Sequence, residues 1–135
     1  MRIIIDIVDH KNQDYDTVGN WNFTEINEES ELTITVSRMN DWRYEVLVGL
    51  HEAIEAILCY DRGISEQSVT DFDVNFEVIR KNGNTEEPGD NKDAPYRKEH
   101  KFSTKIEMMI CKELGIDWKT YSQAVDNLSF DKKDE

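Results

Sequence analysis

Residues 32–58 decide the fold of this chain, and they read LTITVSRMNDWRYEVLVGLHEAIEAIL. The first part alternates apolar and polar side chains, so Leu32, Ile34 and Val36 would share one face of a strand. Beyond Asn40 the apolar residues recur every third or fourth position, which is the spacing of an α-helix. This switch from strand period to helix period predicts a sheet followed by helices, the α+β class.

Two further strands are predicted on the N-terminal side of this stretch. Residues 3–8 form a β-branched run, which predicts a strand with both faces at least partly covered. In residues 21–25 the aromatic side chains alternate with polar ones, which predicts a short, half-exposed strand. The acidic turn at 27–30 would join it to the strand at Leu32 as a hairpin. The sequence thus predicts a small N-terminal sheet of about three strands, antiparallel or mixed.

About four helices are predicted after the sheet. The first would begin at Asn40 or Asp41 and end near Arg62, and its apolar face comprises Leu47, Leu50, Ile54, Ile57 and Leu58. The others would run from Ser65 to about 80, from about Tyr96 to Glu113, and from Asp117 to about Leu128. The third helix is expected to turn inward the residues Phe102, Ile106, Met109 and Ile110.

We expect residues 1–135 to form a single domain. Its parts would be a strand-rich segment at 1–39, a helical segment at 40–128 with a surface loop at 81–95, and a polar tail at 129–135.

The charge of the chain is strongly acidic, with 29 acidic and 16 basic residues and a formal net charge of −13. Such a surface repels phosphate backbones, so we expect no ordinary binding of nucleic acid. The excess of carboxylates is typical of a well-solvated surface. It also fits a face that imitates DNA or that docks on a basic protein partner.

The remaining composition predicts a folded cytoplasmic protein with no membrane association. No apolar run approaches the roughly 20 residues that span a bilayer, and the apolar run at 3–5 is too short for a signal peptide. Cys59 and Cys111 lie far apart within apolar helical patterns, which predicts buried, reduced thiols.

The first helix carries the residues that point to chemistry, His51-Glu52-Ala53-Ile54-Glu55. His51 and Glu55 are four residues apart, so they would project together from the rim of the buried face, while Glu52 would point further toward solvent. A metal site in a cleft needs ligands in such a position, held by the core but open to water.

Other segments offer partners for these two side chains. Glu99 falls on the apolar face of the third helix, His100 follows it, and Asp73 lies at the edge of the second helix's apolar face, where exposure to solvent is the simplest expectation. A site of His51, Glu55, His100 or Glu99, and Asp73 would offer two nitrogens and one or two carboxylates, which suits Zn²⁺, Mn²⁺ or Fe²⁺. Glu52 would then be the general base of a metal-dependent hydrolase.

The order of strand, strand and a helix with His-Glu-x-x-Glu resembles the minimal zincin core, over roughly residues 21–62. In zincins the signature is His-Glu-x-x-His, in which both histidines bind zinc and the glutamate activates water. The resemblance implies metal ligands at His51 and Glu55 and catalysis by Glu52, with Glu55 in place of the second histidine.

As a whole, the chain resembles small proteins encoded by phages and prophages, which implies the host cytoplasm as its location and no particular activity. This resemblance is carried by LHEAIEA at 50–56, EPGD at 87–90, PYR at 95–97, EH at 99–100 and LGIDW at 114–118.

Other interpretations stay open. MazG-type nucleotide pyrophosphohydrolases bind Mg²⁺ through Glu-x-x-Glu and a later Glu-x-x-Asp. Glu52 and Glu55 match the first spacing, but the downstream match at 87–90 contains Pro-Gly and falls in a loop. A non-enzymatic interaction protein would use the acidic surface to bind a partner. A structural scaffold would use the pair of His51 and Glu55 only to stabilise a helix.

Overall fold

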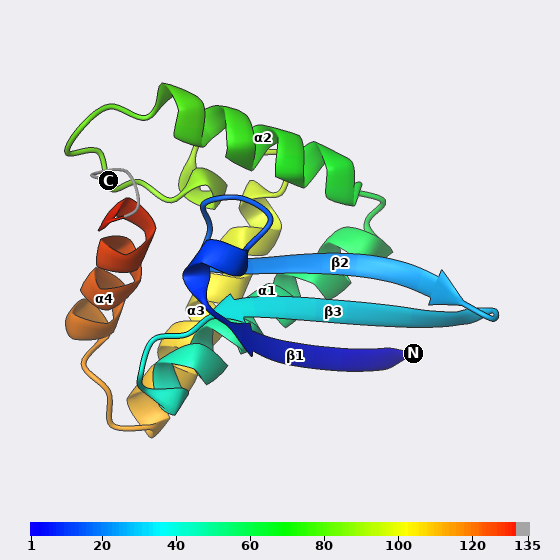
Figure 1. Cartoon of the computed structure of the whole chain (residues 1–135), viewed down its shortest axis with the longest axis horizontal. Coiled ribbons are helices and arrows are strands. Elements are labelled where there is room, and N and C mark those ends of the chain that lie inside the picture. Colours follow the sequence, from blue (N-terminus) through cyan, green and yellow to red (C-terminus); the bar gives the residue numbers. More distant parts are fainter. Residues whose placement is uncertain (132–135) are drawn as a thin grey trace.

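The computed structural model of the chain describes residues 1–131 and builds them into three strands and four α-helices (Figure 1). The strands are β1 (Arg2–Val8), β2 (Gly19–Ile26) and β3 (Glu29–Ser37). The helices are α1 (Trp42–Asp61), α2 (Glu66–Ile79), α3 (Arg97–Glu113) and α4 (Trp118–Asp131), and two single 3-10 turns, η1 (His10–Asn12) and η2 (Pro88–Asp90), lie in the connections. The predicted α+β order of a small sheet followed by four helices is confirmed.

The sheet is mixed, with the order β1-β3-β2. β2 and β3 form the predicted antiparallel hairpin, while β1 lies parallel to β3 on its other side. The hairpin turns at Asn27 and Glu28, whose φ angles are 53° and 68°. Two consecutive residues with positive φ match the right-handed twist of the flanking strands, so the turn needs only two residues.

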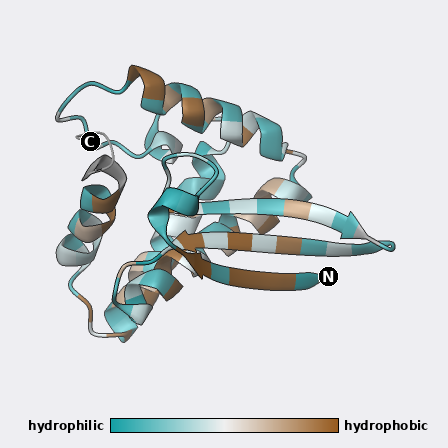
Figure 2. Cartoon of the chain, viewed as in Figure 1, coloured by the Kyte–Doolittle hydropathy of each residue, from teal (hydrophilic) through white to brown (hydrophobic). Residues whose placement is uncertain are grey.

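The core lies between one face of the sheet and α1. Leu32, Ile34 and Val36 are fully buried, and α1 packs against β2 and β3 with Leu47 and Val48 buried. The alternation of apolar and polar residues along β3 is visible as alternating brown and pale segments in Figure 2. Burial of these side chains is the main term that holds the sheet to the helices.

The side chains of β1 are more exposed to solvent than the sequence predicts. Ile3 is 49% exposed and Ile5 is 40% exposed, although both pair with core residues of β3. The prediction of two partly covered faces was therefore wrong for this part of the strand. The reason is position: β1 is an edge strand, and Ile5 stays exposed even though it packs on Gly49 of α1.

The ends of α1 and α2 lie close to where the sequence predicts them. The Asp41 carboxylate accepts a hydrogen bond from the backbone N–H of Arg43, and the Ser65 hydroxyl accepts one from Ser68. These side chains satisfy N–H groups that the first turn of a helix leaves without a partner. Gly63 follows α1 with a φ of 70°, which other residues adopt only with strain.

α3 turns its polar side inward, against the prediction from hydropathy. Phe102 is 48% exposed and Met109 is 61% exposed. The buried residues of this helix are Glu99, His100, Ser103, Glu107 and Cys111. α3 packs directly on α1, so these groups face the interior of the protein. Polar groups can be buried at low cost when they satisfy one another, and the contacts of His51, Glu55 and Glu107 described below do so.

α2 and α4 close the molecule on two sides (Figure 1). α2 runs beside β2, where the Glu66 carboxylate accepts hydrogen bonds from the backbone N–H of Phe23 and the side-chain amide of Asn22, at 3.0 and 2.6 Å. α4 packs on α3 and continues to Asp131, past the predicted end at Leu128. The rest of the predicted tail, 132–135, lies outside the described residues.

Candidate metal centre

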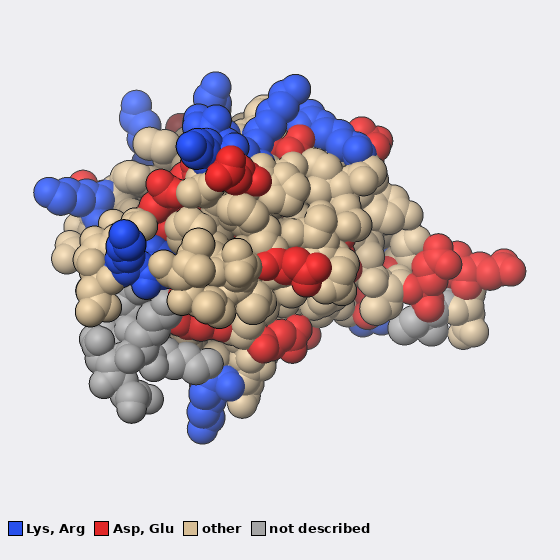
Figure 3. All heavy atoms as spheres, turned by 90° about the horizontal axis from the view of Figure 1, so that it is seen from above, with Lys and Arg blue, Asp and Glu red and all other residues tan. Residues whose placement is uncertain are grey.

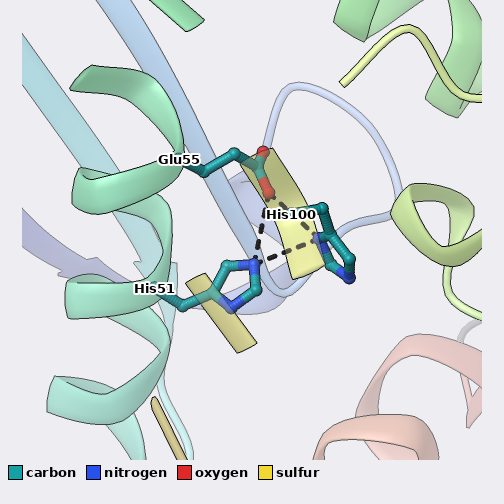
Figure 4. Close-up of side chains that lie close together, drawn as sticks. All are labelled: His51, Glu55 and His100. Atoms are coloured by element: carbon teal, nitrogen blue, oxygen red, sulfur yellow. Dashed lines mark hydrogen bonds and ion pairs between the residues drawn. The ribbon is translucent and has the colours of Figure 1, made fainter. Parts of the chain in front are cut away.

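Three buried side chains from two helices converge on one point (Figure 4). His51 and Glu55 project from α1, and His100 projects from α3. The Nε2 atom of His51 lies 3.2 Å from Glu55 Oε2 and 3.2 Å from His100 Nδ1, and His100 Nδ1 lies 3.0 Å from Glu55 Oε2. Each residue therefore contributes one atom to a compact triangle of possible metal ligands.

The local part of this arrangement follows from helix geometry. Residues four apart lie one above the other on a helix, so His51 and Glu55 point the same way. His100 is added by the packing of α3 on α1. The predicted place at the rim was wrong, because His51 and Glu55 are 6% and 3% exposed and lie between the helices.

The second ring nitrogen of His51 is held by Glu107 from α3. The distance from His51 Nδ1 to Glu107 Oε1 is 2.7 Å, and the Tyr121 hydroxyl of α4 donates to the other carboxylate oxygen at 2.5 Å. An ionised carboxylate only accepts hydrogen bonds, so Nδ1 of His51 carries the proton. Once Nε2 has lost its own proton, it directs a lone pair into the triangle, as a metal ligand must.

The second oxygen of Glu55 is held by the sheet. The indole N–H of Trp21, a buried residue of β2, donates to Glu55 Oε1 at 3.2 Å. This bond fixes the carboxylate so that Oε2 alone points at the two histidines.

The second ring nitrogen of His100 faces two carboxylates from the segment around η2. His100 Nε2 lies 3.0 Å from Glu87 Oε2 and 3.4 Å from Asp90 Oδ1, although neither oxygen is aligned for a hydrogen bond. Between them Gly89 packs on the imidazole so closely that a Cβ atom there would lie 2.3 Å from His100 Cγ. Glycine is required at this position because its backbone touches the ring.

The acid–base properties of the triangle follow from its contacts. Burial lowers the pKa of His51, but hydrogen bonds to Glu107 and Glu55 outweigh it and raise the pKa to about 10. Burial opposes ionisation of Glu55, yet the bonds from His100 and His51 bring its pKa down to about 2. Burial likewise opposes the charge on His100, and its carboxylate neighbours raise its pKa. The carboxylates therefore make this site strongly attractive to positive charge.

Glu52 points toward this site and not toward solvent, which corrects the prediction. Its side chain is half-buried and lines the same cavity as the triangle. It passes close to Gly19 at the start of β2, where a Cβ atom would lie 2.7 Å from Glu52 Cγ. Burial and the neighbouring charge of Glu55 raise the pKa of Glu52 well above its usual range.

Asp73 also lines the cavity, where the sequence predicts an exposed residue. The hydroxyls of Tyr15 and Tyr96 both donate to its carboxylate, the first at 3.1 Å. Burial raises the pKa of Asp73 to about 7, although both tyrosine bonds act in the opposite direction. Its place is beside the triangle, since its oxygens are not among the converging ligand atoms.

Glu99 belongs to a different contact. It is 4% exposed, as its place in the sequence pattern predicts, and its carboxylate lies 2.6 Å from a guanidinium nitrogen of Arg62, just beyond the end of α1. This ion pair accounts for the buried charge and leaves Glu99 outside the triangle.

A cavity of about 130 Å³ adjoins the triangle. Aromatic and acidic residues form much of its lining. They include Tyr15, Trp21, Tyr96, Trp118, Tyr121, Glu52, Asp73, Glu77, Glu87 and Asp126. Burial of aromatic rings limits the access of water, and the carboxylates give the space a negative potential.

Sequence reasoning missed the residues that hold the ligands in place. Glu107 lies seven residues, about two helical turns, after His100 and so on the same face of α3, which is a signal that the sequence does contain. Trp21, Tyr121 and Asp90 gave no such signal, because they come from segments that only the fold brings to the site.

Cys59 and Cys111 are buried free thiols, as predicted. Burial raises the pKa of the Cys59 thiol to about 12.

The described part of the chain contains no helix both long and apolar enough to cross a bilayer. No family model, curated protein or solved structure matches the chain.

Proposed function

We propose that the protein binds a divalent transition-metal ion through His51 Nε2, His100 Nδ1 and Glu55 Oε2, and that it uses the ion for hydrolysis. The observation that carries this proposal is the triangle of these three atoms, with edges of 3.0 to 3.2 Å.

The size of the triangle fits a metal ion. Three ligands on the face of a tetrahedron with bonds of about 2.05 Å are about 3.3 Å apart, and those on an octahedral face with bonds of about 2.15 Å are about 3.0 Å apart. Both arrangements need only small movements of the side chains. Without a metal ion, a proton between the two ring nitrogens, which lie 3.2 Å apart, keeps their lone pairs from facing each other.

The groups around the triangle also support the proposal. Ligating histidines in metalloproteins usually donate their other N–H to a carboxylate or carbonyl, which orients the ring and raises the basicity of the ligand. Here Glu107 holds His51, Trp21 holds Glu55, and Glu87 and Asp90 face the far nitrogen of His100. A simple salt bridge between His51 and Glu55 would need neither these two hydrogen bonds nor the carboxylates beside His100.

The donor set suits Zn²⁺ and Fe²⁺ best, with Mn²⁺ as a weaker match for two imidazoles. A bound ion of this kind acidifies a coordinated water and polarises the bond to be cleaved. Three protein ligands leave positions for that water and for the substrate.

Glu52 is the group that favours hydrolysis. It lines the cavity beside the ligands, and burial and the charge of Glu55 raise its pKa above the usual range, which makes its carboxylate a stronger base. Glu52 would accept a proton from the attacking water as the water oxygen bonds to the carbonyl carbon. It would then donate that proton to the leaving nitrogen or oxygen as its bond to carbon breaks.

The cavity narrows the class of substrate. Its carboxylates disfavour phosphate esters, whose negative charge they would repel. Neutral or cationic amides and esters fit better, and the small volume admits an end group or side chain and not a whole peptide.

The test is elemental analysis of the untagged protein after loading with Zn²⁺ or, without oxygen, with Fe²⁺. We expect about one ion per chain in the wild type, loss of the ion in His51→Ala, and retention in His10→Ala. His10 is a matched control because its imidazole bonds to Ser37 and Asp16 and is not among the converging ligand atoms. Absence of metal from the loaded wild type would overturn the proposal.

The role of Glu52 needs a separate variant. Glu52→Gln should keep the metal content of the wild type and lose turnover of amide or ester substrates. Turnover that survives this change would remove Glu52 as the general base while leaving the metal site intact.

One observation favours a second, non-enzymatic function, which is binding to a basic protein partner. The hairpin of β2 and β3 protrudes from the molecule, and acidic side chains gather at its end (Figure 3). They include Glu25, Glu28, Glu29 and Glu31. Such a contact would weaken as ionic strength rises and would not respond to chelators, which distinguishes it from a metal-dependent activity.

A further inference from the structure

The open edge of β1 is the part of the sheet for which the fold supplies no neighbour. Within residues 1–131, β1 pairs with β3 alone, while α2 and its Glu66 lie along β2 at the opposite edge. β1 is seven residues long and contains no proline, glycine or lysine. Its pairing with β3 runs without a bulge. Lysine, proline and bulges often protect an edge strand from pairing with another chain, and β1 has none of these three, although it carries the charges of Arg2 and Asp6.

The hydrogen bonds of β1 show which of its backbone groups face the open edge. The carbonyl of Val8 accepts a hydrogen bond from Arg38 just beyond the end of β3, at 2.7 Å, so Val8 directs its peptide groups toward β3. Successive residues of a strand direct these groups to opposite edges. Ile3, Ile5 and Ile7 therefore present their N–H and C=O groups at the open edge.

The side chains at the edge are apolar and exposed on the face that meets α1. Ile3 is 49% exposed and Ile5 is 40% exposed, and β1 remains largely brown at the margin of the sheet in Figure 2. Ile5 packs on Gly49 of α1, and Val46 and Trp42 continue the same face of that helix, at 37% and 65% exposed. The apolar surface thus extends from the strand onto the helix.

We propose that this edge pairs with β1 of a second copy of the chain, in antiparallel orientation, and forms a continuous six-stranded sheet. The six strands are the three of each copy. A two-fold axis requires that strands meeting at the interface run antiparallel. With the axis at Ile4, Ile3 lies opposite Ile5 of the second copy, and both are residues whose peptide groups face the edge.

The charged residues of β1, Arg2 and Asp6, favour a second copy as the partner and favour this register. Arg2 and Asp6 are placed symmetrically about Ile4, so Arg2 of each copy lies opposite Asp6 of the other. Arg2 is an exposed side chain that lies 4.0 Å from Glu31 of its own chain, too far for a strong bond. Opposite charges facing each other across antiparallel strands stabilise the pair, and like charges there destabilise it.

The test measures the mass of the full chain by sedimentation equilibrium across a range of concentrations. We expect a dimer for the wild type, and dissociation about tenfold or more easier for Arg2→Glu and for Asp6→Arg, because each change replaces two attractions by two repulsions. The double variant Arg2→Glu/Asp6→Arg should restore the dimer. A wild-type monomer at all concentrations would overturn the proposal, and so would a dimer that neither single change weakens.

A cross-linking experiment checks the register. Ile4 of the two copies would form a non-hydrogen-bonded pair, whose separation of about 4.5 Å between Cα atoms allows a disulfide. Ile4→Cys should give a covalent dimer on mild oxidation. Thr33→Cys is the matched control, because Thr33 pairs with Ile4 on the same face but one strand further from the edge. Equal cross-linking of both variants would contradict the register.

Discussion

His51 Nε2 and His100 Nδ1 lie 3.2 Å apart, although 49 positions separate the two residues in the sequence. Both nitrogens also contact the same oxygen of Glu55. Two protonated nitrogens that face each other at this distance repel each other, so the metal-free site holds one proton between them. A metal ion that binds here would displace this proton. This relationship underlies the predictions about metal binding.

The first prediction concerns Glu107, which holds the ring of His51. Glu107→Gln keeps the shape of the side chain but removes the negative charge that would make His51 a strong ligand of the proposed ion. We expect metal affinity to fall about 10- to 100-fold, as measured by competition with a chromophoric chelator. Glu113→Gln, an exposed change on the same helix, is the control. Equal affinity in both variants would show that Glu107 does not support the site.

The second prediction concerns Gly89, whose backbone touches His100. In Gly89→Ala the new methyl group would lie 2.3 Å from His100 Cγ and 2.4 Å from Nδ1, the proposed ligand atom. The ring must move, so we expect affinity to fall by about tenfold or more and the free energy of unfolding to fall by about 1 to 3 kcal/mol. Chelator competition and urea unfolding measure the two effects. Lys92→Ala, at an exposed residue three positions after the buried Gly89, should change neither.

The third prediction is that metal binding releases protons. The pKa of His51 is raised to about 10 because hydrogen bonds to Glu107 and Glu55 outweigh the effect of burial. At pH 7.5 a proton must therefore leave the His51–His100 pair before the metal binds, and affinity should rise with pH up to about 10. Calorimetric titration in buffers of different ionisation enthalpy gives the number of protons. A heat that does not depend on the buffer would contradict this prediction.

The fourth prediction concerns Asp73 and the pH dependence of stability. Burial raises its pKa from 3.8 to about 7, so the folded protein holds a proton that the unfolded chain has already lost. This contribution to stability is complete below pH 3.8 and is lost as the pH rises to about 7. Between pH 4.5 and pH 8 the wild type should lose on the order of 2 kcal/mol of its free energy of unfolding through this carboxyl group. Asp73→Asn should not show this loss.

Urea unfolding of Asp73→Asn and the wild type at both pH values measures the difference. The exposed Asp71, two residues earlier on α2, provides the control Asp71→Asn. A wild type and an Asp73→Asn variant with the same pH dependence would mean that the carboxyl titrates in the folded protein as it does in the unfolded chain.

The sequence by itself determined the elements and one half of the site. The alternation at Leu32, Ile34 and Val36 and the caps at Asp41 and Ser65 are local features, so they predicted the strand and the helix starts. The spacing of His51 and Glu55 also depends only on the geometry of one helix. Local patterns act between neighbours along the chain, and a single sequence displays them directly.

Only the tertiary structure decided which groups complete the site. Hydropathy predicted that Phe102 and Met109 face inward, yet α3 turns His100 and Glu107 toward α1. The cost of burying a polar group depends on the partner that it meets, and that partner lies on another element. For the same reason the neighbours Glu99 and His100 have different roles. Glu99 pairs with Arg62, whereas His100 joins the triangle. The position of β1 at an open edge likewise depends on the pairing of strands and not on the apolar character of its own residues.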